Sequence, residues 1–102
     1  MSTRATIKFI DGDGDEFYIY RHCDGFPEII MPDITGVLKK SAGRWSGSEM
    51  GMLVSMFLGE MYNPKTRLQN YEMTHSFHGD ESYKYTVRYF EGSGWSVFQE
   101  DN

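Results

Sequence analysis

Hydrophobic and polar residues alternate in two segments near the N-terminus, residues 5–10 and 16–22. An alternation of period two is typical of a β-strand with one buried face. Between them, residues 11–15 alternate Asp and Gly, which favour a tight turn because Gly accepts positive φ and Asp bonds its own backbone. The pattern therefore predicts an N-terminal β-hairpin. The polar face of its second strand would carry Tyr18, Tyr20 and His22.

The period changes to that of a helix in the middle of the chain. Pro32 suits the first turn of a helix that runs to about Lys40. A second helix is preceded by Ser46 and Glu49, the spacing of a capping box. Its apolar residues recur at i, i+3, i+4 and i+7, as one buried helix face requires: Met50, Leu53, Val54, Phe57, Leu58 and Met61.

Three further strands are predicted at about residues 69–77, 83–90 and 95–99. Turn residues at 78–82 and 92–94 separate them and predict two hairpins. Strands that are joined by tight turns are antiparallel. We therefore expect a single α+β domain spanning residues 1–102, with an antiparallel sheet in the order ββααβββ and two helices on one face.

Composition narrows the functional classes. The chain has 102 residues, a formal net charge of −5 and 16% aromatic residues. The negative charge excludes a nonspecific nucleic-acid binder, whose affinity comes from basic groups on phosphates. No apolar run is long enough to cross a membrane. The single Cys23 can form no internal disulfide, so we expect a cytoplasmic protein.

The acidic turn superficially resembles a calcium-binding loop. An EF-hand loop that starts at Asp11 needs Gly at its sixth position and Glu at its twelfth. Those positions hold Glu16 and His22, so the motif fails. We expect neither a metal ion nor a cofactor.

Two histidine–aspartate pairs are the first candidate for chemistry. His22 and Asp24 lie where the second strand ends, and His78 and Asp80 lie in a later turn. Imidazole and carboxylate groups can orient a ligand or exchange protons with it. If the two segments are neighbours, the four side chains converge. The alternative is that both aspartates only close turns.

Two arginines are the second candidate. Arg4 and Arg21, interleaved with Tyr20, would form an anion-binding, stacking pocket for a nucleotide-like ligand. Alternatively, each arginine pairs with one of the many acids. The sequence carries no nucleophile or phosphate-binding motif, so no residue is assigned a catalytic role.

Four segments resemble a family of small proteins encoded by bacteriophages, prophages and bacterial mobile regions. They are residues 2–7 (STRATI), 20–28 (YRHCDGFPE), 71–74 (YEMT) and 78–83 (HGDESY). The family pattern is S-T-R-x-x-I, Y-R-H-x-D-G-[YF]-P and H-G-D-x-E-Y. Here Ser82 replaces the usual acidic residue, and Glu81 lies one place earlier.

The resemblance implies a counter-defence role in the cytoplasm of a host cell. The first hypothesis is an anti-CRISPR-like inhibitor that binds and blocks a host defence protein. The second is sequestration of a nucleotide immune signal, and the third is a small enzyme whose pocket would require a homodimer interface. Under the first hypothesis, the partner-binding residues are acidic and aromatic: Asp13, Asp15, Glu16, Tyr18 and Tyr89.

Overall fold

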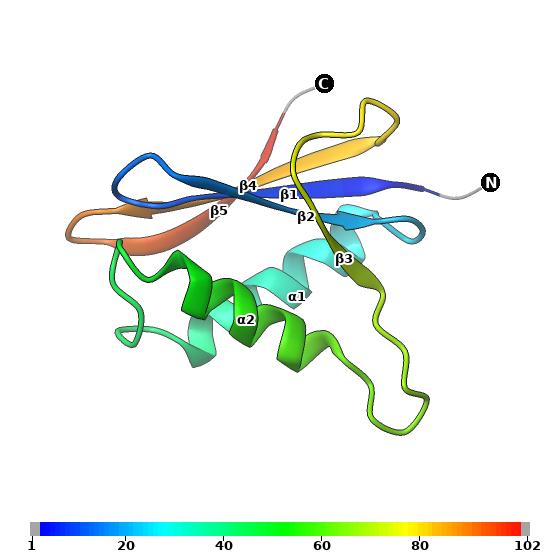
Figure 1. Ribbon diagram of the computed structural model, residues 1–102, viewed down its shortest axis with the longest axis horizontal. Coiled ribbons are helices and arrows are strands. Elements are labelled where there is room, and N and C mark those ends of the chain that lie inside the picture. The colour runs from blue at the N-terminus through cyan, green and yellow to red at the C-terminus, as the bar shows by residue number, and fades with distance from the viewer. Residues whose placement is uncertain (1–2, 101–102) are drawn as a thin grey trace.

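The computed structural model describes residues 3–100 and has two layers, a five-stranded sheet and two helices that cover one of its faces (Figure 1). The strands are β1 (Ala5–Ile10), β2 (Glu16–Arg21), β3 (Tyr71–Thr74), β4 (Tyr83–Phe90) and β5 (Gly94–Glu100), and the helices are α1 (Pro27–Lys40) and α2 (Met50–Met61). This arrangement confirms the α+β class and the order ββααβββ. We call the sheet face opposite the helices the open face.

The sheet is mixed, so the prediction of a fully antiparallel sheet is wrong. Its strand order is β3-β2-β1-β4-β5, and β1 pairs with β4 in parallel. The segment 78–82 is therefore no hairpin turn. It belongs to a connection, residues 75–82, that passes over the open face from β3 to the far side of β1 (Figure 1). We call this connection the crossover.

Burial explains why β4 occupies a central place in the sheet. Tyr85 and Val87 are fully buried beneath the helices, and Thr86 is buried on the open face. A strand that buries both faces gains most when neighbours flank it on both sides. β4 accordingly pairs with β1 on one side and with β5 on the other. The local turn residues at 78–82 give no information about this distant pairing.

Helix α1 begins earlier than the sequence predicts. Pro27 is its first residue, and the carbonyl oxygen of Phe26 accepts the amides of Ile29 and Ile30. Proline is favoured at the first helical position, where its missing N–H costs nothing. Pro32, expected in that role, lies inside the helix instead.

The core lies between the sheet and the helices. The α2 stripe is confirmed in its centre, where Phe57 packs edge-on against Phe9 of β1 and Tyr71 of β3. The buried apolar residues from the two layers meet there: Ile7, Phe9, Ile19, Tyr85 and Val87 from the sheet, and Ile30, Ile34, Val37, Leu53, Val54 and Phe57 from the helices. Among residues 3–100, no helix is both long enough and apolar enough to cross a membrane.

Engineered cysteines test the parallel pairing. Lys8 and Thr86 are Cα partners on the open face, so the Lys8→Cys/Thr86→Cys pair should form a disulfide in a Cys23→Ser background. Thr74→Cys/Thr86→Cys is the control, because those positions would face each other in a β3–β4 hairpin. In the observed sheet they are three strand spacings apart, about 14 Å, which is too far for a disulfide. Mass spectrometry after mild oxidation distinguishes the two. A disulfide only in the control pair would contradict the fold.

Candidate functional site

The crossover brings four of the predicted ligand-binding residues together on the open face. The rings of Tyr20 and His78 stack with their centroids 3.8 Å apart and their planes 9° apart. The Tyr20 hydroxyl lies 3.4 Å from both carboxylate oxygens of Asp80. The same carboxylate pairs with the Arg4 guanidinium at 3.4 Å. Arg4 directly precedes β1, Tyr20 belongs to β2, and His78 and Asp80 belong to the crossover.

Glu81 fastens the crossover to the sheet. Its carboxylate accepts hydrogen bonds from the Thr6 hydroxyl at 2.5 Å and from the backbone N–H groups of His78 at 2.9 Å and Gly79 at 2.8 Å. Partial burial raises the pKa of Glu81, but these hydrogen bonds outweigh that effect and lower the pKa below its usual 4.5. The ionised carboxylate is therefore the form that the folded protein stabilises.

The side chains of the cluster around Tyr20 mainly contact one another. Tyr20 is 3% exposed although it lies on the face that the helices leave open, because the crossover covers it. The His78 ring is 2.9 Å from the Thr74 hydroxyl in addition to its contact with Tyr20. Burial, together with the nearby Asp80 carboxylate, raises the pKa of Tyr20, so its hydroxyl stays protonated. These contacts hold the crossover in place and pair most of the polar groups of the cluster. The buried Nε atom of Arg4 has no hydrogen-bond partner among residues 3–100.

Arg21 does not join Arg4. It lies on the helix-covered face, where its Nε donates to the carbonyl oxygen of Cys23 at 2.7 Å and its guanidinium lies 4.9 Å from the Tyr71 ring centroid. Asp33 of α1 is 3.7 Å from the guanidinium and accepts the Tyr71 hydroxyl at 2.7 Å. Neighbouring residues of a strand face opposite ways, so Arg21 ties β2 to α1 while Tyr20 faces the crossover.

Of the first histidine–aspartate pair, only His22 lies near the cluster that contains the second pair. His22 is exposed, and its ring centroid is 6.3 Å from that of Tyr20, so His22 and His78 both flank this tyrosine. Asp24 is exposed and has a φ of 57°, a conformation that favours Asp and Asn in turns. Among residues 3–100, no group of three or more His, Cys, Asp and Glu side chains is placed to hold a metal ion.

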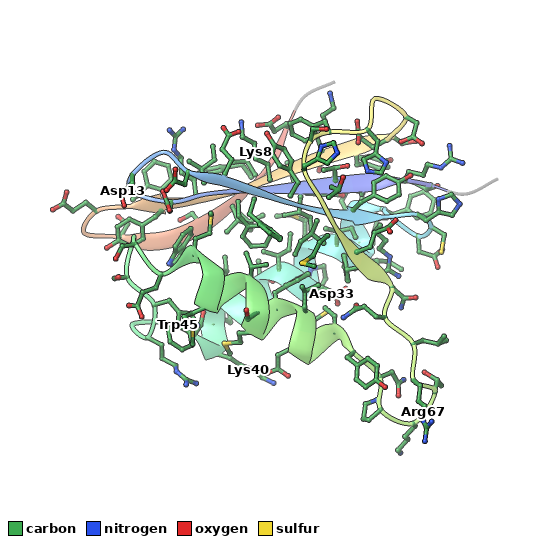
Figure 2. The ribbon with its side chains drawn as sticks, viewed as in Figure 1. Lys8, Asp13, Asp33, Lys40, Trp45 and Arg67 are labelled. Carbon is green, nitrogen blue, oxygen red and sulfur yellow. The ribbon has the colours of Figure 1, made fainter. Side chains whose placement is uncertain are left out.

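Two of the predicted partner-binding residues, Asp13 and Asp15, lie in the turn between β1 and β2 at the other end of the sheet. Asp11 is nearly buried, and its Oδ1 accepts the backbone N–H groups of Asp13 and Asp15, both at 2.9 Å. Asp13 and Asp15 are exposed, and no ion pair between residues 3 and 100 involves either of them. Figure 2 places Asp13 at the tip of this end, with Trp45 below it.

Glu16 and Tyr18 are engaged on the open face. Glu16 pairs with Lys8 at 3.1 Å and accepts the Tyr18 hydroxyl at 2.9 Å. These hydrogen bonds, that from Lys8 foremost, lower the pKa of Glu16, whereas burial and the bond to Glu16 raise the pKa of Tyr18. The Tyr18 ring contacts Phe77 of the crossover edge-on at 5.2 Å. Tyr18 thus helps to hold the crossover on the sheet, and Glu16 holds the Tyr18 hydroxyl.

Tyr89 lines a cavity of about 410 Å³ beside the acidic turn. The cavity lies between the loop from α1 to α2 and the β4–β5 hairpin, and Trp45, Glu49 and Trp95 also line it. Sequence reasoning did not identify these three as site residues. Trp45 and Trp95 are far apart in sequence, and the only sequence signal that they share is the Gly and Ser residues around each of them.

The acidic turn and the cavity are parts of one surface. The N–H of Gly12 donates to the carbonyl oxygen of Gly47 at 2.8 Å. A Cβ atom at Gly47 would lie 2.5 Å from the Tyr89 ring, so only glycine fits against it. We call the turn 11–15, the loop 41–49 and the hairpin turn 91–94 together the acidic end.

Comparisons of the chain with protein-family models, with curated proteins and with solved structures find no match. The geometry of the acidic end and of the Tyr20 cluster is therefore the basis for assigning a function.

The role of Glu81 can be tested by pH. Glu81→Gln should reduce the free energy of unfolding by about 1–3 kcal/mol at pH 7, because hydrogen bonds to a charged acceptor are lost. The folded-state pKa is lowered, so this stabilisation is complete above pH 4.5 and disappears as the pH falls through the folded-state value. Urea titrations of wild type and variant should therefore converge in acid.

The matched control is Glu72→Gln, an exposed glutamate on β3. It should change stability by less than about 0.5 kcal/mol at either pH. If both variants lost the same stability, or if the Glu81→Gln deficit persisted unchanged at pH 3, Glu81 would not be the anchor of the crossover.

Proposed function

We propose that the protein is a non-enzymatic counter-defence factor of a phage or mobile element, an anti-CRISPR-like inhibitor. It binds a host immune effector by presenting its acidic end to a basic surface of that effector and so blocks it. The net charge of −5 and the resemblance to the phage-encoded family support this role. Complementary potentials steer two proteins together and fix their register without any catalysis.

The observation that carries the proposal is the rigid presentation of two unpaired carboxylates. Asp11 fixes the backbone of the turn through two side-chain bonds, and its own N–H donates to the carbonyl oxygen of Asp15 at 3.0 Å. The Gly12–Gly47 hydrogen bond fixes the turn against the neighbouring loop. A preorganised surface loses little conformational entropy on binding, so more of its interaction energy appears as affinity.

A surface that binds nucleic acid is the kind of partner surface that fits best. Such surfaces are lined by Lys and Arg, which neutralise phosphates. Exposed carboxylates of Asp13 and Asp15 can occupy the same positions as phosphates and exclude the nucleic acid. Inhibition by this route requires neither a nucleophile nor a metal.

The Tyr20 cluster gives less support to the other two functions. A nucleotide base that stacks on Tyr20 would have to displace His78, and a phosphate on Arg4 would compete with the Asp80 carboxylate, which lies 3.4 Å from the guanidinium. One of the two ring nitrogens of His78, Nε2, already lies within hydrogen-bond distance of the Thr74 hydroxyl. We therefore assign this cluster a structural role rather than a ligand-binding or catalytic one.

Charge reversal tests the proposal. Asp13→Lys/Asp15→Lys should weaken inhibition of a purified CRISPR effector complex by about tenfold or more near physiological salt, because attraction at the contact becomes repulsion. The measurement is the inhibitor concentration that reduces DNA binding by the effector to half of its uninhibited level. For wild type, this inhibition should also weaken as salt is raised from about 0.05 to 0.3 M.

The matched control changes the net charge by the same amount at the opposite end of the sheet. Glu28→Lys/Glu72→Lys alters two exposed acids and should leave inhibition within about twofold of wild type. Equal losses from both double variants would mean that net charge alone matters. No loss from the Asp13→Lys/Asp15→Lys variant would refute the proposed surface.

A further inference from the structure

The function proposed above uses the carboxylates of the turn and assigns no role to the cavity at the acidic end. We propose that it receives an arginine side chain of the partner protein. This inference rests on the proposed function and names the contact at its centre. Binding energy at protein interfaces is concentrated in a few anchors that fill pockets, and arginine is among the commonest of them.

Three aromatic side chains form the walls of the cavity. The rings of Tyr89 and Trp95 meet edge-on with centroids 5.4 Å apart. The Trp95 indole donates from Nε1 to the carbonyl oxygen of Trp45 at 3.1 Å, which fixes the loop 41–49 against the β4–β5 hairpin. The volume of about 410 Å³ lies within the range of pockets that bind small groups. The walls are therefore held by contacts between separate elements.

One wall already accepts a guanidinium. The Cζ atom of Arg44, from the same loop, lies 4.9 Å from the Trp45 ring centroid. Aromatic faces carry partial negative charge and attract cations, and the planar guanidinium also stacks on them. A second guanidinium that enters the cavity would find the Trp95 and Tyr89 rings beside it.

The charges around the cavity favour a cation over a phosphate. Glu49 lines it, and the backbone N–H of Ser46 donates to Glu49 Oε1 at 3.1 Å, which holds the carboxylate in place. Asp13 and Asp15 project from the adjoining turn, and Glu91 lies in the hairpin turn that supplies Ser93 to the lining. Within the lining, Glu49 balances the charge of Arg44, so the excess of negative charge around the cavity comes from the carboxylates of the two adjoining turns.

Arginine fits these features better than lysine. Its guanidinium can stack on a ring and bond a carboxylate through two N–H groups at once, whereas the lysine ammonium is a strongly hydrated point charge. The combination of aromatic walls and one fixed carboxylate therefore predicts selectivity for arginine. A surface that attracted cations by net charge alone would bind arginine and lysine equally well.

Intrinsic fluorescence reports on the cavity directly, because both tryptophans of the chain line it. The probes are hexa-arginine and hexa-lysine peptides, titrated into the intact protein at low salt. Hexa-arginine should change the tryptophan emission saturably, with a Kd about tenfold lower than that of hexa-lysine. Equal affinities, or binding of hexa-arginine without a change in emission, would overturn the inference.

Two variants test whether the preference for arginine arises in the cavity. Glu49→Gln should reduce the preference for arginine to about threefold or less, because the carboxylate partner is lost. Ser93→Phe fills the cavity from an exposed turn position and should abolish the preference even if Glu49→Gln folds poorly. Retention of the full preference in Ser93→Phe would overturn the inference.

Failure of this inference and failure of the proposed function have different signatures. If the cavity takes no arginine but the proposed function holds, the peptides show no selectivity while Asp13→Lys/Asp15→Lys still loses inhibition of the effector. If the proposed function fails, that double variant inhibits as well as wild type, whatever the peptides do.

Discussion

The carboxylate of Glu81 is the contact on which the rest of the structure depends. Parallel strands of one sheet are usually joined by a long connection that contains a helix, yet the chain passes from β3 to β4, which runs in the same direction three strand spacings away, through residues 75–82 alone. A short irregular connection must satisfy its backbone on the sheet itself. Glu81 accepts two of its amides and the Thr6 hydroxyl, and the carbonyl oxygen of Arg4 accepts the amides of Ser82 and Tyr83. With the crossover fixed, β4 lies beside β1 and buries both of its faces.

This constraint divides the molecule into two ends with different tasks. At one end, which we call the motif end, three of the segments that resemble the phage-encoded proteins meet: the start of β1, the end of β2 and the crossover (Figure 1). Their rings and charges contact one another and hold the chain together. At the other end, the acidic turn, the loop 41–49 and the β4–β5 hairpin leave carboxylates and aromatic rings facing solvent or the cavity. The contacts at the motif end stabilise the fold, and under the proposed function the acidic end stays exposed to bind the partner.

The sequence predicted what local periodicity determines and missed what distant contacts determine. Residues 5–10 and 83–90 alternate cleanly, so β1 and β4 were predicted with their bounds, and the helical stripe identified α2. The crossover could not be predicted, because Gly79, Asp80 and Ser82 have the same turn propensity in a hairpin as in a crossover. The Tyr20–His78 stack depends on that crossover, and the cavity depends on Trp45 and Trp95 meeting. Neither contact is encoded by spacing along the chain.

The central claim is that the motif end holds the fold while the acidic end meets the partner. Hydrogen–deuterium exchange of the protein, alone and in complex with an effector that it inhibits, tests this claim most directly. The account predicts slower exchange on binding at residues 11–15, 41–49 and 91–94, with residues 20–24 and 76–81 unchanged. Protection of the motif segments on binding, with the acidic end unaffected, would contradict it.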